Sequence, residues 1–141
     1  MDQKIINEYA RWKQLATEDA DLARELGEID GKEDQIVDAF YREFGTGGLR
    51  GVIGAGTNRM NVYTVAKASQ GLADYVIKHF PAEQRRIAVS YDSRIKSDLF
   101  ARTASGVFAA NGITVHMYPE LMPTPCLSFA VRELHCAAGI M

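Results

Sequence analysis

The chain has 141 residues, of which 47% are hydrophobic and 24% charged, as expected for one globular domain with its own core. Its longest apolar run, at 136–141, has six residues, whereas a membrane span needs about 20. The N-terminus lacks the layout of a signal peptide, and two cysteines form no disulfide framework. We therefore expect a soluble, cytoplasmic protein without a membrane partner.

Charge is distributed unevenly along the chain, although the net charge is only −2. Residues 1–44 contain 6 basic and 12 acidic side chains, whereas residues 45–141 contain 10 basic and 6 acidic ones. The mildly basic part, residues 45–141, suits the binding of small anions. The alternative, to which we give equal weight, is that the acidic residues 1–44 simply form a solvated set of helices. Nucleic acid is excluded as a partner, because the sequence has no basic stripe with a docking motif.

Apolar periodicity predicts three helices at the N-terminus. The first covers residues 2–16, the second is short and runs from residue 19 or 20 to residue 26, and the third covers about 33–43. Gly27 is expected to be the C-cap of the second helix. We interpret residues 1–43 as a helical N-terminal extension without recognisable chemistry.

From residue 44 onward, helices alternate with strands. The expected order is a strand before residue 55, a helix at 62–79, a strand at 86–91, a helix at 98–110, a strand at 113–117, a helix at 124–134 and a strand at 136–141. Asn61, Ser97 and Thr124 are the expected helix N-caps. This order predicts an α/β protein, with a three-layer α/β/α domain and a mixed, mainly parallel sheet over 44–141.

The segment from Phe44 to Gly51 has four glycines in eight residues. Successive backbone N–H groups in such a segment can form an anion nest, and an arginine fork suits bidentate contact with phosphate. The candidate phosphate-binding residues are therefore Thr46, Gly47, Gly48 and Arg50. The alternative is a glycine-rich turn with a solvated Arg50. The spacing matches neither a Rossmann fingerprint nor a P-loop.

Asp92 and Arg94 follow the strand predicted at 86–91, and loops at the carboxyl ends of strands bind ligands in open α/β sheets. Alternatively, Asp92 caps a turn and Arg94 pairs with it. Asn58 and Arg59 offer either a second phosphate contact or an ordinary loop with a surface charge. No serine has a histidine and a carboxylate nearby in the pattern, so no catalytic residue is assigned, and no cluster suggests a metal site.

Five motifs in a fixed order resemble the N-terminal domain of the α-D-phosphohexomutases, in the phosphoglucomutase and phosphomannomutase branch. They are Phe44–Gly51, Thr57–Asn61, Tyr91–Arg94, Pro123–Pro125 and Ala137–Met141. Gly47 departs from the pattern, because relatives commonly have alanine or serine there. The resemblance covers about 44–141, which we interpret as domain I of this family, preceded by the extension 1–43.

The resemblance implies an enzyme that moves a phosphoryl group between C1 and C6 of a hexose phosphate, glucose or mannose, through a phosphoserine and glucose 1,6-bisphosphate or its mannose counterpart. Arg50 would contact phosphate, and Asp92 and Arg94 would line or brace the same cleft. Mg²⁺ would be held by an aspartate-rich loop of a later domain, outside this sequence.

In this family the phosphoserine lies in a Thr-Ala-Ser-His-Asn-Pro segment directly after a strand like 137–141. We therefore expect domain I to be incomplete at its C-terminus and the 141-residue chain to be inactive by itself. Its expected partners are the remaining domains of the same chain, with self-association through an exposed C-terminal strand. The alternative functions are a free-standing sugar-phosphate or anion-binding module and a domain for protein contacts.

Overall fold

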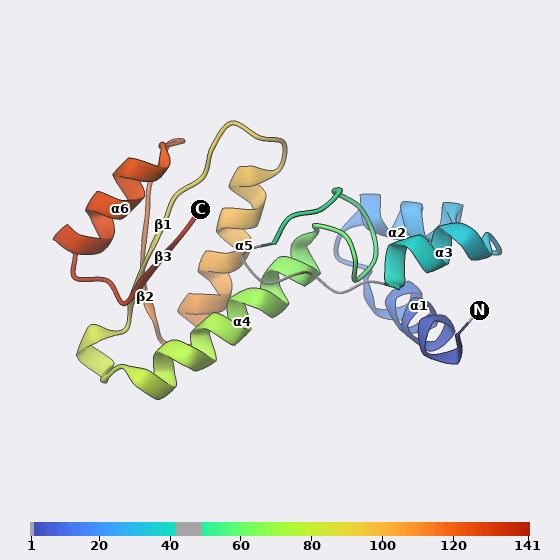
Figure 1. The fold of residues 1–141 in the computed structure, drawn as a ribbon, viewed down its shortest axis with the longest axis horizontal. Coiled ribbons are helices and arrows are strands. Elements are labelled where there is room, and N and C mark those ends of the chain that lie inside the picture. The colour runs from blue at the N-terminus through green and yellow to red at the C-terminus, as the bar shows by residue number, and fades with distance from the viewer. Residues whose placement is uncertain (1, 42–48) are drawn as a thin grey trace. The chain divides into compact units, whose positions relative to one another are not determined.

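The computed structural model describes residues 2–41 and 49–141 (Figure 1). The chain divides into two compact units, Met1–Thr64 and Val65–Met141, and each is described by itself. The boundary predicted at residues 43 and 44 lies outside the described residues and stays a prediction.

The first unit contains three helices, α1 (Gln3–Leu15), α2 (Ala20–Glu28) and α3 (Glu33–Phe40), as the sequence predicts. The carboxylates of Asp2 and Asp19 cap α1 and α2 by accepting backbone N–H groups of the first turn. The placement of Gly27 as a C-cap is wrong, because α2 continues through it. Gly31, with φ of 74°, supplies the left-handed backbone of the turn that leads to α3.

An apolar cluster holds the three helices together. Aromatic rings meet edge to face within it: the centroid of the Phe40 ring lies 5.9 Å from the centroid of the Tyr9 ring and 5.7 Å from that of the Trp12 ring. The buried members are Ile5, Tyr9, Ala16, Leu22, Leu26, Ile36, Ala39, Phe40 and Ala55. Because Ala55 belongs to this cluster, the loop that follows the glycine-rich segment shares the core of the helices.

The loop at residues 54–60 folds back on the helices of its own unit. The backbone N–H of Ala55 donates to the Glu25 carboxylate at 2.9 Å. Gly56 has a φ of 119°, and a Cβ there would lie 2.4 Å from the Ala39 carbonyl oxygen. No strand is found among residues 49–54, where Ile53 forms only an isolated bridge to Met60. The strand predicted before residue 55 is therefore absent from the described part, since these residues pair within the loop.

The second unit begins within α4 (Val62–His79) and contains a parallel sheet. It continues with a 3₁₀ turn (Ala82–Gln84), β1 (Arg86–Val89), α5 (Ser97–Ala110), β2 (Thr114–Met117), α6 (Thr124–Glu133) and β3 (Ala138–Ile140). The strand order is β2-β1-β3, and both pairings are parallel. α5 packs on β1 and β2, α6 packs on β1 and β3, and the two helices flank the strands (Figure 1). The α/β class and the layered arrangement are confirmed.

Small residues let α6 approach the sheet closely. Ala88 and Gly139 are register partners on β1 and β3. A Cβ at Gly139 would lie 2.5 Å from Val131 Cγ2 and 3.2 Å from Leu127 Cδ1, whereas real side chains pack at ordinary van der Waals distances. The α6 face of the sheet therefore has no room for a larger side chain at residue 139.

Two of the three expected helix caps are wrong by one residue. Ser97 is the first residue of α5, after Lys96 in a left-handed conformation, and its hydroxyl accepts a hydrogen bond from the Asp92 N–H. Thr124 is the first residue of α6, after Pro123, and its hydroxyl donates to Met141 Sδ at 2.9 Å. Both hydroxyls serve loop contacts instead. None of the helices in ranges 2–41 and 49–141 has the length and hydropathy of a membrane span.

Candidate functional site

The carboxyl edge of the sheet is the first candidate site. The three strands are parallel, so their carboxyl ends lie at one edge, where open α/β sheets bind ligands. β1 is the middle strand, and Asp92 and Arg94 lie in the loop that follows its last residue, Val89. The fold thus places both candidate residues at the end of the central strand.

Asp92 holds Arg94 through two hydrogen bonds. Its Oδ1 accepts the Arg94 backbone N–H at 3.0 Å, and its Oδ2 accepts the Arg94 Nε–H at 2.7 Å. These bonds, the backbone one foremost, hold the pKa of the Asp92 carboxyl below its ordinary value despite partial burial. Asp92 is therefore a carboxylate at neutral pH, and the alternative that it caps a turn and pairs with Arg94 describes this geometry.

The pairing leaves the end of the Arg94 guanidinium open. The side chain of Arg94 is 81% exposed. Its Nη groups make no hydrogen bond to any residue within 2–41 or 49–141. A guanidinium oriented through Nε, with both terminal nitrogens open to solvent, suits bidentate contact with a phosphate or carboxylate.

Asn58 and Arg59 lie together in the first unit, and both contact α3. The Arg59 guanidinium forms an ion pair with the Asp38 carboxylate, and its side chain is only 18% exposed. The Asn58 Nδ2 donates to the Asp38 carbonyl oxygen at 3.0 Å, and the Asn58 N–H donates to the Ala39 carbonyl at 2.9 Å. Both residues fasten the loop at 54–60 to α3.

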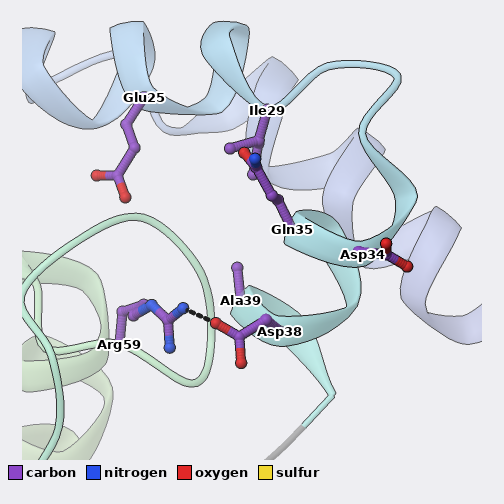
Figure 2. A pocket seen from close by; sticks show the side chains of 7 residues that line it. All are labelled: Glu25, Ile29, Asp34, Gln35, Asp38, Ala39 and Arg59. Atoms are coloured by element: carbon purple, nitrogen blue, oxygen red, sulfur yellow. Dashed lines mark hydrogen bonds and ion pairs between the residues drawn. The ribbon is translucent and has the colours of Figure 1, made fainter.

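A pocket of about 300 Å³ lies between α2, α3 and this loop (Figure 2). Its lining residues are Glu25, Ile29, Asp34, Gln35, Asp38, Ala39 and Arg59. Figure 2 shows the Arg59 guanidinium turned toward Asp38, so the single cation of the lining is already neutralised. Three carboxylates beside one paired guanidinium repel an anion, and this pocket is therefore a poor phosphate site.

The glycine-rich segment is only partly described. Thr46, Gly47 and Gly48 lie outside the described residues. Arg50 is exposed, and no hydrogen bond or ion pair joins its side chain to another residue that the structure describes. Among these residues the Arg50 guanidinium thus has no partner, as is the case for the terminal nitrogens of Arg94.

A metal ion has no site in the described ranges: no three histidine, cysteine, aspartate or glutamate side chains there form a group that could hold one. The expectation of Mg²⁺ concerns residues outside this sequence and stays a prediction.

Ser90 is a residue of this edge that the sequence reasoning did not single out. It follows β1 directly, is 1% exposed, and its hydroxyl has no hydrogen-bond partner among the described residues. The signal in the sequence is a small polar residue at the end of an otherwise apolar strand, directly before Tyr91 and Asp92.

A comparison with protein families matches residues 41–141 to "Phosphoglucomutase/phosphomannomutase, alpha/beta/alpha domain I". Because this match covers most of the chain, the chain belongs to that family. The resemblance carried by the five motifs is thereby confirmed.

Curated relatives are phosphomutases. A probable phosphoribomutase of Schizosaccharomyces pombe is 44% identical over 99 residues, 70% of this chain and 17% of the relative. The phosphopentomutase of Homo sapiens is 35% identical over 153 residues, 99% of this chain and 24% of the relative. A phosphoglucomutase of Staphylococcus aureus is 37% identical over 142 residues, which cover 90% of this chain and 24% of the relative. The chain thus spans a quarter or less of these relatives, and no solved structure gives a significant match.

Proposed function

We propose that this chain supplies domain I of a phosphomutase that moves a phosphoryl group between C1 and C6 of glucose or mannose phosphate, through a phosphoserine and a hexose 1,6-bisphosphate. The observation that supports the proposal is the family match over 41–141, which contains all candidate phosphate-binding residues. The match to a protein named phosphoglucomutase supports a hexose as the substrate.

The proposed role of the described residues is to position and neutralise phosphate. Phosphoryl transfer depends chiefly on alignment and on compensation of negative charge. Arg50, together with the backbone at 46–48, would bind a phosphoryl group through its open guanidinium. Arg94, oriented by Asp92, would contact a negatively charged group at the end of β1. Asn58 and Arg59 would act indirectly, by holding the loop that follows Arg50 against α3.

A pentose phosphate is the second candidate substrate. It is favoured by the relatives named probable phosphoribomutase and phosphopentomutase, which match with comparable identity. Both substrates use the same phosphoryl chemistry, so the two candidates differ in the sugar and not in the roles of Arg50, Asp92 and Arg94.

The test uses the full-length protein that carries this chain. Glucose 1-phosphate, mannose 1-phosphate and ribose 1-phosphate are supplied, each with its bisphosphate, and the product is measured. We expect turnover of at least one sugar, and none by residues 1–141 alone. Without turnover of any of them, the mutase proposal fails. A thermal shift on addition of sugar phosphate would then favour the alternative, an anion-binding module.

Arg50→Ala tests the assignment of the phosphate-binding residue. Hydrogen bonds to a charged group contribute enough that kcat/KM is expected to fall about 10- to 100-fold. Arg102→Ala, which removes an exposed arginine of α5, is the matched control and is expected to retain activity. If kcat/KM and bisphosphate affinity of Arg50→Ala equal those of the control, Arg50 does not bind phosphate.

A further inference from the structure

The loop between β1 and α5 closes on itself through Ser97, the first residue of α5. The Ser97 hydroxyl accepts the backbone N–H of Asp92 at 3.2 Å. The backbone N–H of Ser97 donates to the Arg94 carbonyl oxygen at 3.1 Å. Ser97 thus contacts both residues of the pair at the end of β1, Asp92 through its side chain and Arg94 through its backbone.

Asp92 transmits this contact to the Arg94 side chain. Its carboxylate accepts the backbone N–H of Arg94 at 3.0 Å and the Nε–H at 2.7 Å. The hydrogen bond from the Arg94 backbone is the largest cause that lowers the pKa of Asp92, and a side-chain hydrogen bond with Ser97 is a smaller one. Ser97 therefore supports Asp92 at its backbone and at its carboxylate, and Asp92 in turn fixes the guanidinium at Nε.

The backbone of this loop has a conformation that needs support. Lys96 lies inside the turn that the Ser97 N–H closes, and its φ of 62° is in the left-handed region that residues with a Cβ rarely adopt. Such a conformation persists only where the surrounding contacts determine it. The hydrogen bonds that Ser97 and Asp92 form within the loop therefore help to hold it in this shape.

An arginine that is already held at Nε loses less rotamer freedom when it binds an anion than a free one does. The terminal nitrogens of Arg94 make no hydrogen bond to residues 2–41 or 49–141. We propose that Ser97 is a positioning residue for anion binding by Arg94: its hydroxyl holds Asp92, and Asp92 holds the guanidinium with both terminal nitrogens open to a phosphate. The proposal rests on the proposed function for the identity of that anion, the phosphoryl group of the substrate.

The experiment measures amide hydrogen exchange of residues 92–97 in the full-length protein at increasing concentrations of inorganic phosphate. Phosphate bound by Arg94 slows this exchange, and the concentration that gives half of the effect reports the affinity at this loop. Ser97→Ala is expected to raise that concentration about 3- to 10-fold, the size of one lost hydrogen bond. Ser97→Thr keeps the hydroxyl and should bind phosphate as the wild type does. The matched control is Ser105→Ala, which removes a hydroxyl of the same helix that contacts Met117 Sδ at 3.5 Å and should leave the phosphate concentration unchanged.

A purely structural role of Ser97 gives a different result. If its hydroxyl only stabilises the start of α5, exchange at 92–97 accelerates in Ser97→Ala without phosphate, while the phosphate concentration for half protection equals that of the wild type. That result overturns the inference, and so does a wild-type loop that phosphate does not protect. If Ser97→Ala does not fold, Ser97→Cys, whose thiol forms weaker hydrogen bonds, decides by the same measurement.

Turnover separates failure of this inference from failure of the proposed function. KM for the sugar phosphate is expected to rise by the same factor in Ser97→Ala with kcat unchanged, because the weakened contact is made in the ground state and in the transition state alike. If no sugar phosphate is turned over while phosphate still protects the wild-type loop better than that of Ser97→Ala, the proposed function fails and the role of Ser97 in anion binding stands. If sugar phosphate is turned over and Ser97→Ala equals Ser105→Ala in KM and in protection, only the role of Ser97 fails.

Discussion

Asn61 is expected to be the most costly polar side chain to remove from the first unit. It is 2% exposed and uses both ends of its amide. Its Oδ1 accepts the N–H groups of Tyr63 and Thr64 at 3.1 and 3.0 Å, which caps α4 as the sequence predicts. Its Nδ2 donates to the carbonyls of Gly54 and Gly56 at 2.8 and 3.0 Å. It therefore ties the start of α4 to the loop at 54–60.

Asn61→Ala removes both functions at once. Loss of an N-cap costs about 1 kcal/mol. Buried carbonyls left without a donor cost about 1–3 kcal/mol more. The free energy of unfolding is therefore expected to fall by about 2–4 kcal/mol, measured from the urea midpoint at constant m-value.

Two further variants separate the contributions of the Asn61 amide. Asn61→Ser keeps a capping oxygen and should recover about 1 kcal/mol of the loss. Asn58→Ala removes a single exposed hydrogen bond to the Asp38 carbonyl and should cost less than about 1 kcal/mol. A loss below about 0.5 kcal/mol in Asn61→Ala would refute the role assigned to the buried amide.

Two other predictions concern stability. Gly139→Ala should lower the free energy of unfolding by about 1–3 kcal/mol, because its Cβ would meet Val131 at 2.5 Å. Gly106→Ala, whose Cβ would meet nothing within 4 Å on α5, should instead stabilise by up to about 1 kcal/mol; equal thermal shifts would contradict the packing argument. Burial and the adjacent Asp30 carboxylate raise the pKa of Tyr9 from 10.0 to about 12, so the folded state keeps a proton that the unfolded chain loses. Stability should be unaffected below pH 10 and fall by up to about 2–3 kcal/mol between pH 10 and 12, and Tyr9→Phe should abolish that decline in urea titrations.

The sequence pattern was sufficient to predict those elements whose buried side chains recur with the period of a helix or of a strand. The 18-residue helix α4 begins after Asn61 and ends at His79, where the apolar periodicity and the cap predict. The parallel strands β1, β2 and β3 lie within the apolar stretches assigned to them. One face of each of these elements packs against a neighbouring element, so the spacing of the apolar residues in the sequence is enough to identify it as a helix or a strand.

The sequence pattern gave wrong predictions where contacts between residues far apart in the sequence determine the local conformation. The segment before residue 55 has β-branched residues, yet it forms no strand, because Ala55 donates to Glu25 thirty residues earlier and Gly56 lies against Ala39. The expectation for Gly27 failed because Leu26 is buried and Gly31 provides the turn further on. Ser90 was missed because only the packed sheet shows that its hydroxyl lacks a partner.

The uneven charge distribution left two interpretations open: the basic residues bind small anions, or the acidic helices are merely solvated. One acidic residue of these helices does more than face solvent, because Asp38 of α3 forms an ion pair with Arg59. A phosphate could recruit Arg59 only by displacing that carboxylate, at the expense of a contact that holds the loop to α3. Arg94 differs, because Asp92 binds its Nε and leaves the fork free. An anion gains both terminal nitrogens of Arg94 without breaking the pair, and the side chain has less rotamer freedom left to lose on binding. Arg94, unlike Arg59, therefore has no ion pair to break before its terminal nitrogens can bind an anion.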